Sequence, residues 1–277
     1  MVILAVLGRG VIPAGDPFLT ADDLGLTRGD GIFTTMNVRG GDPWLLEEHL
    51  LRLVASAANM GLDLPAPEAL AELAGQACAQ WDPQVEAGLK MVCTRGSESL
   101  GVPTIFATIS PVPPTSRALR DSGVSLKTLS LGYPAEARRD APWLLGGTKT
   151  LSYAVNMASQ RHAQASGFDD ALWISSDGFA LEGPTSTLIW HEGDELVTVP
   201  SSGTGILPGI TAAFALSRSS ELGLGAGERM ITPEELPEMS GAWMVSSVRG
   251  IVPIRAVEGV PLKESPKHKA LRELLGF

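Results

Sequence analysis

The chain has 277 residues, of which 44% are hydrophobic and 19% charged, a composition typical of folded globular proteins with more than one domain. Acidic residues (31) outnumber basic ones (21), and the net charge of −10 opposes non-specific binding to nucleic acid or to anionic membranes. The apolar stretch 1–7 ends at Gly8, too early for a signal segment or a membrane-spanning helix. We therefore expect a cytoplasmic protein with neither nucleic acid nor membrane as a partner.

The first half of the chain predicts a mixed α/β domain. Residues rich in β-formers flank a turn at Gly40-Gly41 and predict a strand pair, and apolar residues at helical spacing precede Gly61, where a helix would end. Three prolines within 111–114 interrupt every regular pattern, so we place an N-terminal domain over 1–113 and an interdomain linker over 114–123. The expected elements are strands over 1–7, 31–38, 43–46, 89–94 and 104–109 and helices over 47–60 and 67–79.

The second half predicts a larger, β-rich domain over 124–277 with packing helices. Alanine-rich sequence before Gly167 favours a helix, and Asp177-Gly178 is a tight hairpin turn between two strands. The fold class is therefore α/β, in the α+β sense, with two domains. The expected elements are strands over 124–131, 171–175, 179–182, 187–191, 195–199, 242–245 and 251–254 and helices over 152–166 and from Thr211 towards Leu222.

Metal binding is not indicated. Cys78 and Cys93 lie in apolar sequence, which favours small buried thiols over a disulfide or a metal site. His162, His191 and His268 show no ligand spacing with one another. We therefore expect no catalytic metal.

Lys149 is the most informative residue, because it precedes a predicted helix and Glu182 follows at the end of a predicted strand. A lysine amine forms a Schiff base with pyridoxal 5′-phosphate (PLP), and an acidic partner can keep the pyridine nitrogen protonated so that the ring accepts electrons. Most lysines are solvated surface residues, so this pair of residues does not by itself establish the cofactor.

A PLP site also needs donors for a phosphate group. Pro208-Gly209 forces a turn that brings Thr211 to the start of a helix, where the first amides and the helix dipole favour an anion. Ser246-Ser247 can add hydroxyl and amide donors, and Arg52, on the helix face that also carries His49, can add a cation. Each has an ordinary alternative. Thr211 can be a simple N-cap, Ser246-Ser247 a simple loop, and Arg52 the partner in a surface salt bridge.

The order of the motifs along nearly the whole chain resembles a known family, the class IV or fold-type IV PLP enzymes. This family includes branched-chain aminotransferases, D-amino-acid aminotransferases and aminodeoxychorismate lyases. The resemblance implies a two-domain fold-type IV enzyme with PLP as cofactor, a small amino-acid-like substrate and a homodimeric assembly. The matching segments are Gly29-Asp30-Gly31-Ile32-Phe33, His49-Leu50-Leu51-Arg52-Leu53, Lys149, Glu182-Gly183, Leu207-Pro208-Gly209-Ile210-Thr211 and Ser246-Ser247.

The resemblance implies a role for each matching residue. Lys149 is implied to be the Schiff-base lysine, which then removes the Cα proton as general base, and Glu182 to contact the pyridine nitrogen. Leu207 matches the position that packs against the ring. Tyr153 can contact the ring oxygen, although the branched-chain enzymes space it one residue further, or it can face the core. The implied phosphate-holding residues are Arg52, Ile210, Thr211, Ser246 and Ser247, and Gly209 is a further candidate cofactor-binding residue.

Phe33-Thr34-Thr35 bears on the branch of the family, because it resembles the Phe-Thr-Thr of some aminodeoxychorismate lyases. In those lyases a hydroxyl at this position is suited to proton transfer to the departing pyruvate, so Thr34 and Thr35 are candidate catalytic residues. The alternative is that both threonines are ordinary β-forming residues of a strand. The preferred prediction is 4-amino-4-deoxychorismate lyase, which yields 4-aminobenzoate and pyruvate for folate synthesis. The alternative is a class IV aminotransferase acting on D-amino or branched-chain amino acids.

The loop after Thr94-Arg95-Gly96 counts against a D-amino-acid enzyme. Residues 97–102, Ser-Glu-Ser-Leu-Gly-Val, lack the Arg-x-His carboxylate trap in which those enzymes resemble one another, and they also lack the basic residue that lyases often carry there. Binding of a dicarboxylate substrate then requires Arg39, Arg95 or Arg249 to supply the charge.

Overall fold

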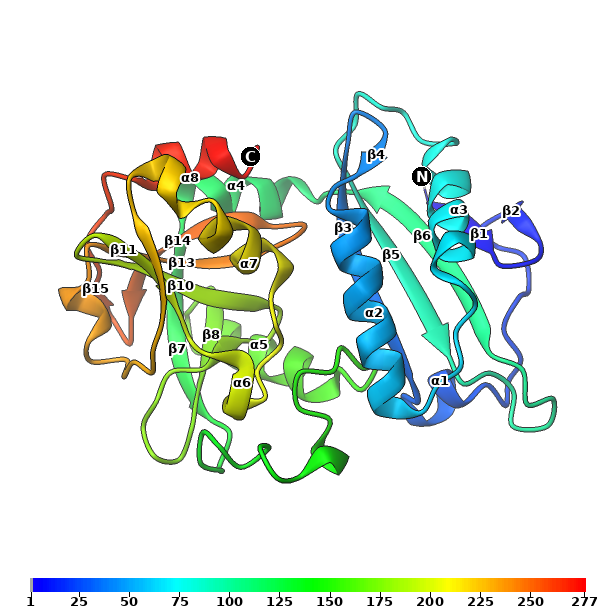
Figure 1. Cartoon of the computed structure of the whole chain (residues 1–277), viewed down its shortest axis with the longest axis horizontal. Coiled ribbons are helices and arrows are strands. Elements are labelled where there is room, and N and C mark those ends of the chain that lie inside the picture. Colours follow the sequence, from blue (N-terminus) through cyan, green and yellow to red (C-terminus); the bar gives the residue numbers. More distant parts are fainter. Residues whose placement is uncertain (1) are drawn as a thin grey trace. The chain divides into compact units, whose positions relative to one another are not determined.

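The computed structural model describes residues 2–277, which form two compact units (Figure 1). Of the described residues, unit 1 comprises 2–113 and Thr148–Tyr153, and unit 2 comprises Pro114–Gly147 and Ala154–Phe277. Each unit has its own sheet and its own hydrophobic core, and the predicted α/β class is confirmed. Within residues 2–277, every helix falls short of the length and apolar character that crossing a bilayer requires.

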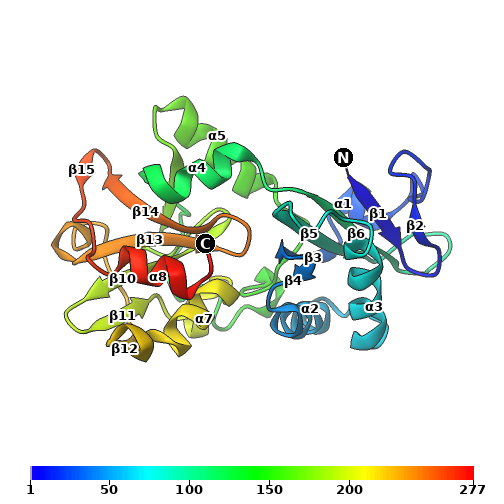
Figure 2. The same ribbon diagram turned by 90° about the horizontal axis from the view of Figure 1, so that it is seen from above.

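Unit 1 is a six-stranded antiparallel sheet in the order β2-β1-β6-β5-β3-β4. Figure 2 shows α2 and α3 on one side of this sheet. Leu53 of α2 and Leu73 of α3 share one core with Ile32 and Met36 of β3. The elements are β1 (Ile3–Val6), β2 (Gly10–Ile12), α1 (Leu24–Arg28), β3 (Gly31–Arg39), β4 (Asp42–Pro43), α2 (Leu46–Met60), α3 (Pro67–Cys78), β5 (Ala87–Thr94) and β6 (Thr104–Pro111).

Strand β3 separates its side chains into two sets, because successive β residues point to opposite faces. The even-numbered residues from Ile32 to Val38 face α2, with which they form the core. The odd-numbered residues from Phe33 to Arg39 lie on the other face. This alternation decides which residues can act together in unit 1.

Unit 2 is built on a nine-stranded mixed sheet with the main path β12-β11-β10-β13-β14-β7-β8, to which β9 and β15 add at β10 and β14. Its strands are β7 (Val124–Ser130), β8 (Asp170–Ile174), β9 (Glu182–Gly183), β10 (Ser186–Glu192), β11 (Glu195–Thr198), β12 (Gly225–Glu228), β13 (Gly241–Ser246), β14 (Gly250–Val257) and β15 (Val260–Pro261). Its helices are α4 (Pro114–Ser122), α5 (Ala154–Ala165), α6 (Ser201–Thr204), α7 (Ile210–Ser217) and α8 (His268–Leu274), with 3₁₀ turns at Pro142–Leu144, Ser219–Leu222 and Leu236–Glu238.

Helices cover both faces of this sheet. Helix α5 packs against β7 and β8, α4 against β14, and α7 against β10, β11 and β13. Figure 2 shows α4 and α5 on one side of the sheet and α7 on the other. The apolar core of this unit includes Leu188, Trp190 and Met244, which lie on the strands of the sheet.

The segment 114–123, expected as a linker, is largely helical and belongs to unit 2, where it forms α4. Pro114 stands at the helix start, where a missing N–H is tolerated. The buried residue of α4 is charged, Arg120, so apolar periodicity does not mark this helix in the sequence.

Candidate active site

Lys149 lies in a short extended segment that pairs with the edge of β3 in unit 1. Phe33 N donates to the Lys149 carbonyl (3.0 Å), and Leu151 N donates to the Gly31 carbonyl (2.8 Å). The Lys149 amide also donates to Ser56 Oγ of α2 (3.3 Å). The segment was expected within the 124–277 domain; its hydrogen bonds to β3 and α2 place it in unit 1 instead.

Glycine residues permit this close pairing. A Cβ added at Gly31 would lie 2.7 Å from both Cys93 O and Leu151 Cδ1. At Gly29, φ is +70° and an added Cβ would lie 2.6 Å from Ser152 Oγ. The two glycines therefore let the lysine-bearing segment approach β3.

The Lys149 side chain contacts an aromatic pair. Its Nζ donates to Tyr153 Oη (3.0 Å) and lies 4.5 Å from the centre of the Phe33 ring. The Phe33 and Tyr153 rings meet edge to face with centroids 5.0 Å apart. Tyr153 precedes α5, is only half-buried, and contacts the lysine amine. These contacts hold the amine on the Phe33 face of β3.

Thr34 lies on the opposite face of β3, in a hydrogen-bond chain with α2. Its Oγ1 lies 2.7 Å from His49 Nδ1 and accepts from Arg52 NH2 (3.2 Å). The guanidinium can only donate to Thr34, and in the contact between Thr34 Oγ1 and His49 Nδ1 the tautomer of His49 decides which group is the donor. Burial lowers the pKa of His49 to about 3, and the charges of Arg52 and Lys149 add to this lowering of the pKa. Neutral His49 therefore orients Thr34, and Thr34 orients Arg52.

Thr35 and Lys90 are direct partners between β3 and β5, so both share the Phe33 face. Lys90 Nζ lies 4.5 Å from the Phe33 ring centre, as Lys149 Nζ does. Although much of the Lys90 side chain is exposed, partial desolvation of its ammonium group lowers its pKa. Sequence reasoning missed Lys90; the available signal was a lone lysine in the apolar strand 89–94.

The arginines considered for substrate binding all have partners, and Arg39 Nε donates to Asn37 Oδ1 (2.6 Å). Arg95 Nε donates to Asp30 Oδ2 (2.8 Å), and Arg249 NH1 donates to the buried Asp170 Oδ2 (2.5 Å). Both guanidinium groups are therefore engaged by carboxylates. Arg39 is an odd-numbered residue of β3 and lies on the same face as the two lysines.

In unit 2, Glu182 and Leu207 lie together. Leu207 N lies 3.3 Å from each carboxylate oxygen of Glu182 and donates to the carboxylate. Strand β9 also pairs Glu182 with Thr187 of β10. A backbone amide and a strand pairing thus fix the direction of the carboxylate.

Gly209 is the N-cap of α7, so that Ile210 opens the helix. A Cβ at Gly209 would lie 2.1 Å from Thr187 Oγ1, and only glycine permits this packing. The N-cap residue has no side chain to cap the helix, so the first-turn amides are available to an anion.

Hydroxyl groups gather at the same helix start. Thr211 lies in the first turn of α7, and its Oγ1 is 3.4 Å from Ser247 Oγ. Ser247 follows Ser246, the last residue of β13. The structure thus brings Thr211 and Ser247 together, with Ser246 adjacent in the chain.

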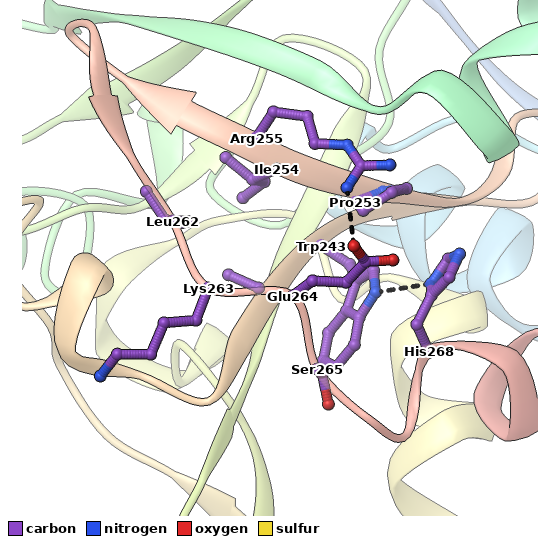
Figure 3. A pocket seen from close by; sticks show the side chains of 10 residues that line it. Trp243, Pro253, Ile254, Arg255, Leu262, Lys263, Glu264, Ser265 and His268 are labelled. Carbon is purple, nitrogen blue, oxygen red and sulfur yellow. Dashed lines mark hydrogen bonds and ion pairs between the residues drawn. The ribbon is translucent and has the colours of Figure 1, made fainter.

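A separate pocket of unit 2 is lined by residues of β13, β14 and the segment that leads into α8 (Figure 3). Arg255 pairs with Glu264 (3.3 Å), and Trp243 Nε1 donates to His268 Nδ1 (3.0 Å). Among residues 2–277, those that line this pocket include none of the predicted site residues. It therefore contributes nothing to the candidate active site.

The lysine amine of unit 1, and in unit 2 the oriented carboxylate and the helix start without a side-chain cap, are groups that PLP-dependent enzymes use. The model of the family amino-transferase class IV matches residues 31–257. The chain belongs to this family and is an enzyme with PLP as cofactor, as the motif order predicted.

Known proteins agree with this assignment. The bifunctional aminodeoxychorismate lyase / D-amino acid transaminase of Mycobacterium tuberculosis is 37% identical, with 99% of this chain and 97% of that protein covered. A hypothetical aminotransferase from M. tuberculosis, solved in a PLP-bound form and in a form with alpha-ketoglutarate and PMP, is 35% identical with a TM-score of 0.95, covering 99% of this chain and 97% of that chain. A fold IV-transaminase from Curtobacterium pusillum is 33% identical with a TM-score of 0.93, and all of both chains is covered.

The residues present fit PLP chemically. Lys149 offers an amine held by Tyr153. Glu182 offers a carboxylate directed by an amide. The Thr211 and Ser247 hydroxyls at an uncapped helix start suit a phosphate group.

Proposed function

We propose that the protein is a 4-amino-4-deoxychorismate lyase, which converts its substrate to 4-aminobenzoate and pyruvate. In this proposal Lys149 carries PLP, Glu182 contacts the pyridine nitrogen and Leu207 packs against the ring. Tyr153 contacts the ring oxygen. The phosphate is held by Arg52, Ile210, Thr211, Ser246 and Ser247, and Gly209 also contacts the cofactor.

The observation that supports the lyase is the cationic face of β3. Lys90 Nζ lies 4.5 Å from the Phe33 ring centre, on the face that also carries Arg39 and the cofactor lysine Lys149. Aminodeoxychorismate has two carboxylates, which cations bind through charge-assisted hydrogen bonds. Lys90 thus supplies a positive charge that the loop 97–102 lacks.

In the proposed reaction, different side chains of the protein have different roles. When bound, PLP supplies an electron-accepting ring that stabilises negative charge at the substrate Cα. Lys149 moves the Cα proton, and Glu182 holds a proton at the pyridine nitrogen. Thr35, on the lysine face, gives a proton to the departing pyruvate, whereas Thr34 is engaged by His49 and Arg52.

A class IV aminotransferase acting on D-amino or branched-chain amino acids is the second candidate. The similar M. tuberculosis protein is named for both lyase and D-amino acid transaminase activity. In this chain, however, the hydroxyls of Ser97 and Ser99 donate to Asp22 Oδ2 (2.6 and 2.9 Å). A loop tied to a carboxylate is a poor place to bind a substrate carboxylate, and this favours the lyase.

Product analysis separates the two candidates. PLP-reconstituted enzyme would be incubated with aminodeoxychorismate and, separately, with D-alanine or L-leucine plus 2-oxoglutarate. 4-Aminobenzoate without keto acid supports the lyase, keto acid without 4-aminobenzoate overturns it, and both products identify a bifunctional enzyme. Lys149→Ala should abolish these activities and the visible absorption band of the bound cofactor; an enzyme that keeps the band would contradict the role of Lys149.

We also propose that the chain forms a homodimer. Leu26, Leu100 and Val102 are more than half exposed. A backbone bridge between Asp23 and Ser97 joins the segment that carries Leu26 to the segment that carries Leu100 and Val102. Exposed apolar groups on neighbouring segments favour burial against a partner. Light scattering of the purified enzyme should give about twice the chain mass of 29.1 kDa; a mass of one chain at micromolar concentration would reject the dimer.

A further inference from the structure

The turn that follows β13 is held by Arg120 of α4. Arg120 Nε donates to the Arg249 carbonyl (2.9 Å), and its NH2 donates to the Val248 carbonyl (2.9 Å). Arg120 is only 6% exposed. Burying a guanidinium is unfavourable unless its donors are satisfied, and here two of the donors are directed at consecutive carbonyls of one turn.

The end of the chain completes this anchor. The Arg120 guanidinium lies 4.5 Å from the centre of the Phe277 ring. The ring also packs against Gly250, where an added Cβ would lie 2.8 Å from it. Phe277 N donates to the Arg272 carbonyl (3.0 Å), Arg272 Nε donates back to Phe277 O (3.1 Å), and Arg272 pairs with Asp121 of α4. The chain end is therefore fixed on α4 beside the turn.

The same turn carries a hydroxyl of the candidate phosphate site. Ser247 Oγ lies 3.4 Å from Thr211 Oγ1, and Val248 and Arg249 follow directly. In a trans peptide the C=O and N–H point in opposite directions, so holding the Val248 carbonyl also fixes the direction of the Arg249 N–H. A guanidinium that donates to the carbonyl polarises the peptide group and strengthens its N–H as a donor.

We propose that Arg120 and Phe277 are positioning residues for the cofactor phosphate. They act through the turn 246–250, which they hold in the conformation that presents Ser246 and Ser247. The inference rests on the proposed function, because it takes the phosphate to lie at Thr211 and Ser247.

The test compares PLP with pyridoxal, which has the same aldehyde and ring but no phosphate. Apo-enzyme is titrated with each, and the visible absorbance of the bound form is followed. Arg120→Met should weaken PLP binding roughly 10- to 100-fold, as loss of hydrogen bonds to a charged group does, and change pyridoxal binding less than about 2-fold. Arg117→Met, at an exposed position of the same helix, is the matched control and should bind both like the wild type.

Two further variants keep the test decisive. Arg120→Lys should recover part of the lost PLP affinity, because it keeps the charge without the paired donors. Phe277→Ala should weaken PLP binding a few-fold and leave pyridoxal binding unchanged. This variant tests the inference if Arg120→Met does not fold. Equal loss of both affinities in a folded variant, or no loss of either, overturns the inference.

Ser247→Ala distinguishes this inference from the proposed function. If Ser247→Ala loses the preference for PLP over pyridoxal and Arg120→Met keeps it, the phosphate site stands and the inference fails. If Ser247→Ala keeps the full preference, the phosphate site is misassigned and the inference fails with it. Loss of the preference in both variants supports the inference.

Discussion

Thr34 and Thr35 are neighbours in the sequence with different surroundings, because they point to opposite faces of β3. The Thr34 hydroxyl is engaged by His49 and Arg52. Thr35 pairs with Lys90 on the face where Lys149 lies. We therefore infer that Thr34 supports the arginine proposed for the phosphate, and that Thr35 is the hydroxyl available to substrate.

Substitution by valine separates these two roles, because valine keeps the shape of threonine and removes its hydroxyl. Thr35→Val should slow the release of aminobenzoate at saturating substrate about 10²-fold, the size typical of a lost proton-transfer group, with PLP affinity unchanged. Thr34→Val should weaken PLP binding, because Arg52 loses an acceptor that orients it. Steady-state kinetics and PLP titration measure the two effects; a larger loss of turnover at Thr34 would reverse the assignment.

His49 should make the folded state sensitive to acid. Its pKa is about 3 in the folded chain, against about 6.5 in the unfolded chain, so below pH 6.5 the unfolded state binds more protons. Stability should therefore fall as pH falls, by up to about 1.4 kcal/mol per pH unit from this residue. Urea unfolding of wild type and His49→Asn between pH 7 and about 4 tests this, since the asparagine amide can accept from Thr34 or donate to it but does not titrate.

The expected result is that the stability difference between wild type and His49→Asn changes with pH and favours the variant increasingly at acidic pH. His162→Asn, at an exposed position of α5, is the control and should follow the wild type. Parallel stability curves for wild type and His49→Asn would show that His49 is not held neutral.

At the scale of elements, the contact between the 148–153 segment and β3 depends on Gly31. An added Cβ would lie 2.7 Å from Cys93 O and from Leu151 Cδ1, so Gly31→Ala should destabilise the fold by about 1–3 kcal/mol through overpacking. Gly75→Ala is the matched control, because nothing lies within 4 Å of its added Cβ in α3. The control should gain about 0.5–1 kcal/mol from helix propensity. Urea unfolding measures both, and a Gly31→Ala variant as stable as wild type would refute the close pairing.

Elements that depend on local sequence were predictable, and those that depend on distant partners were not. The strand expected over 31–38 is β3 and the helix expected over 47–60 is α2, because apolar spacing reports both directly. Helix α4 was missed, since its buried residue is the charged Arg120. The pairing of residues 148–153 with β3 was missed because periodicity does not reveal which strand edge a segment joins.

The residue types of the candidate site could be predicted from motif order, whereas their geometry could not. The sequence supplied Lys149 and Glu182 as an amine and a carboxylate. It could not separate Thr34 from Thr35, because this needs the face of β3 that α2 covers. It contains Lys90 as a lone lysine in an apolar strand, but it could not place Lys90 beside Thr35, because this needs the register between β3 and β5.

At the scale of the whole molecule, an anionic chain must bind anionic ligands. The net charge of −10 repels a phosphate ester and a dicarboxylate at long range, but salt screens such repulsion beyond about 8–10 Å. Binding therefore depends on local groups. We propose that these are Lys90 and Arg52 in unit 1 and the start of α7 in unit 2.

The proposed site residues come from both units, since Lys149 belongs to unit 1 and Thr211 to unit 2. If both sets serve the same cofactor, PLP should slow amide hydrogen exchange in 148–153 as well as in 207–213 and 246–250. At a PLP concentration about 100 times Kd, binding raises the free energy of a local opening by up to about 2.7 kcal/mol, if that opening releases the cofactor. Pyridoxal, without the phosphate, should protect 148–153 and leave 246–250 near its apo rate. Exchange followed by mass spectrometry measures this directly, and PLP protection confined to one unit would show that Lys149 and Thr211 do not bind one cofactor.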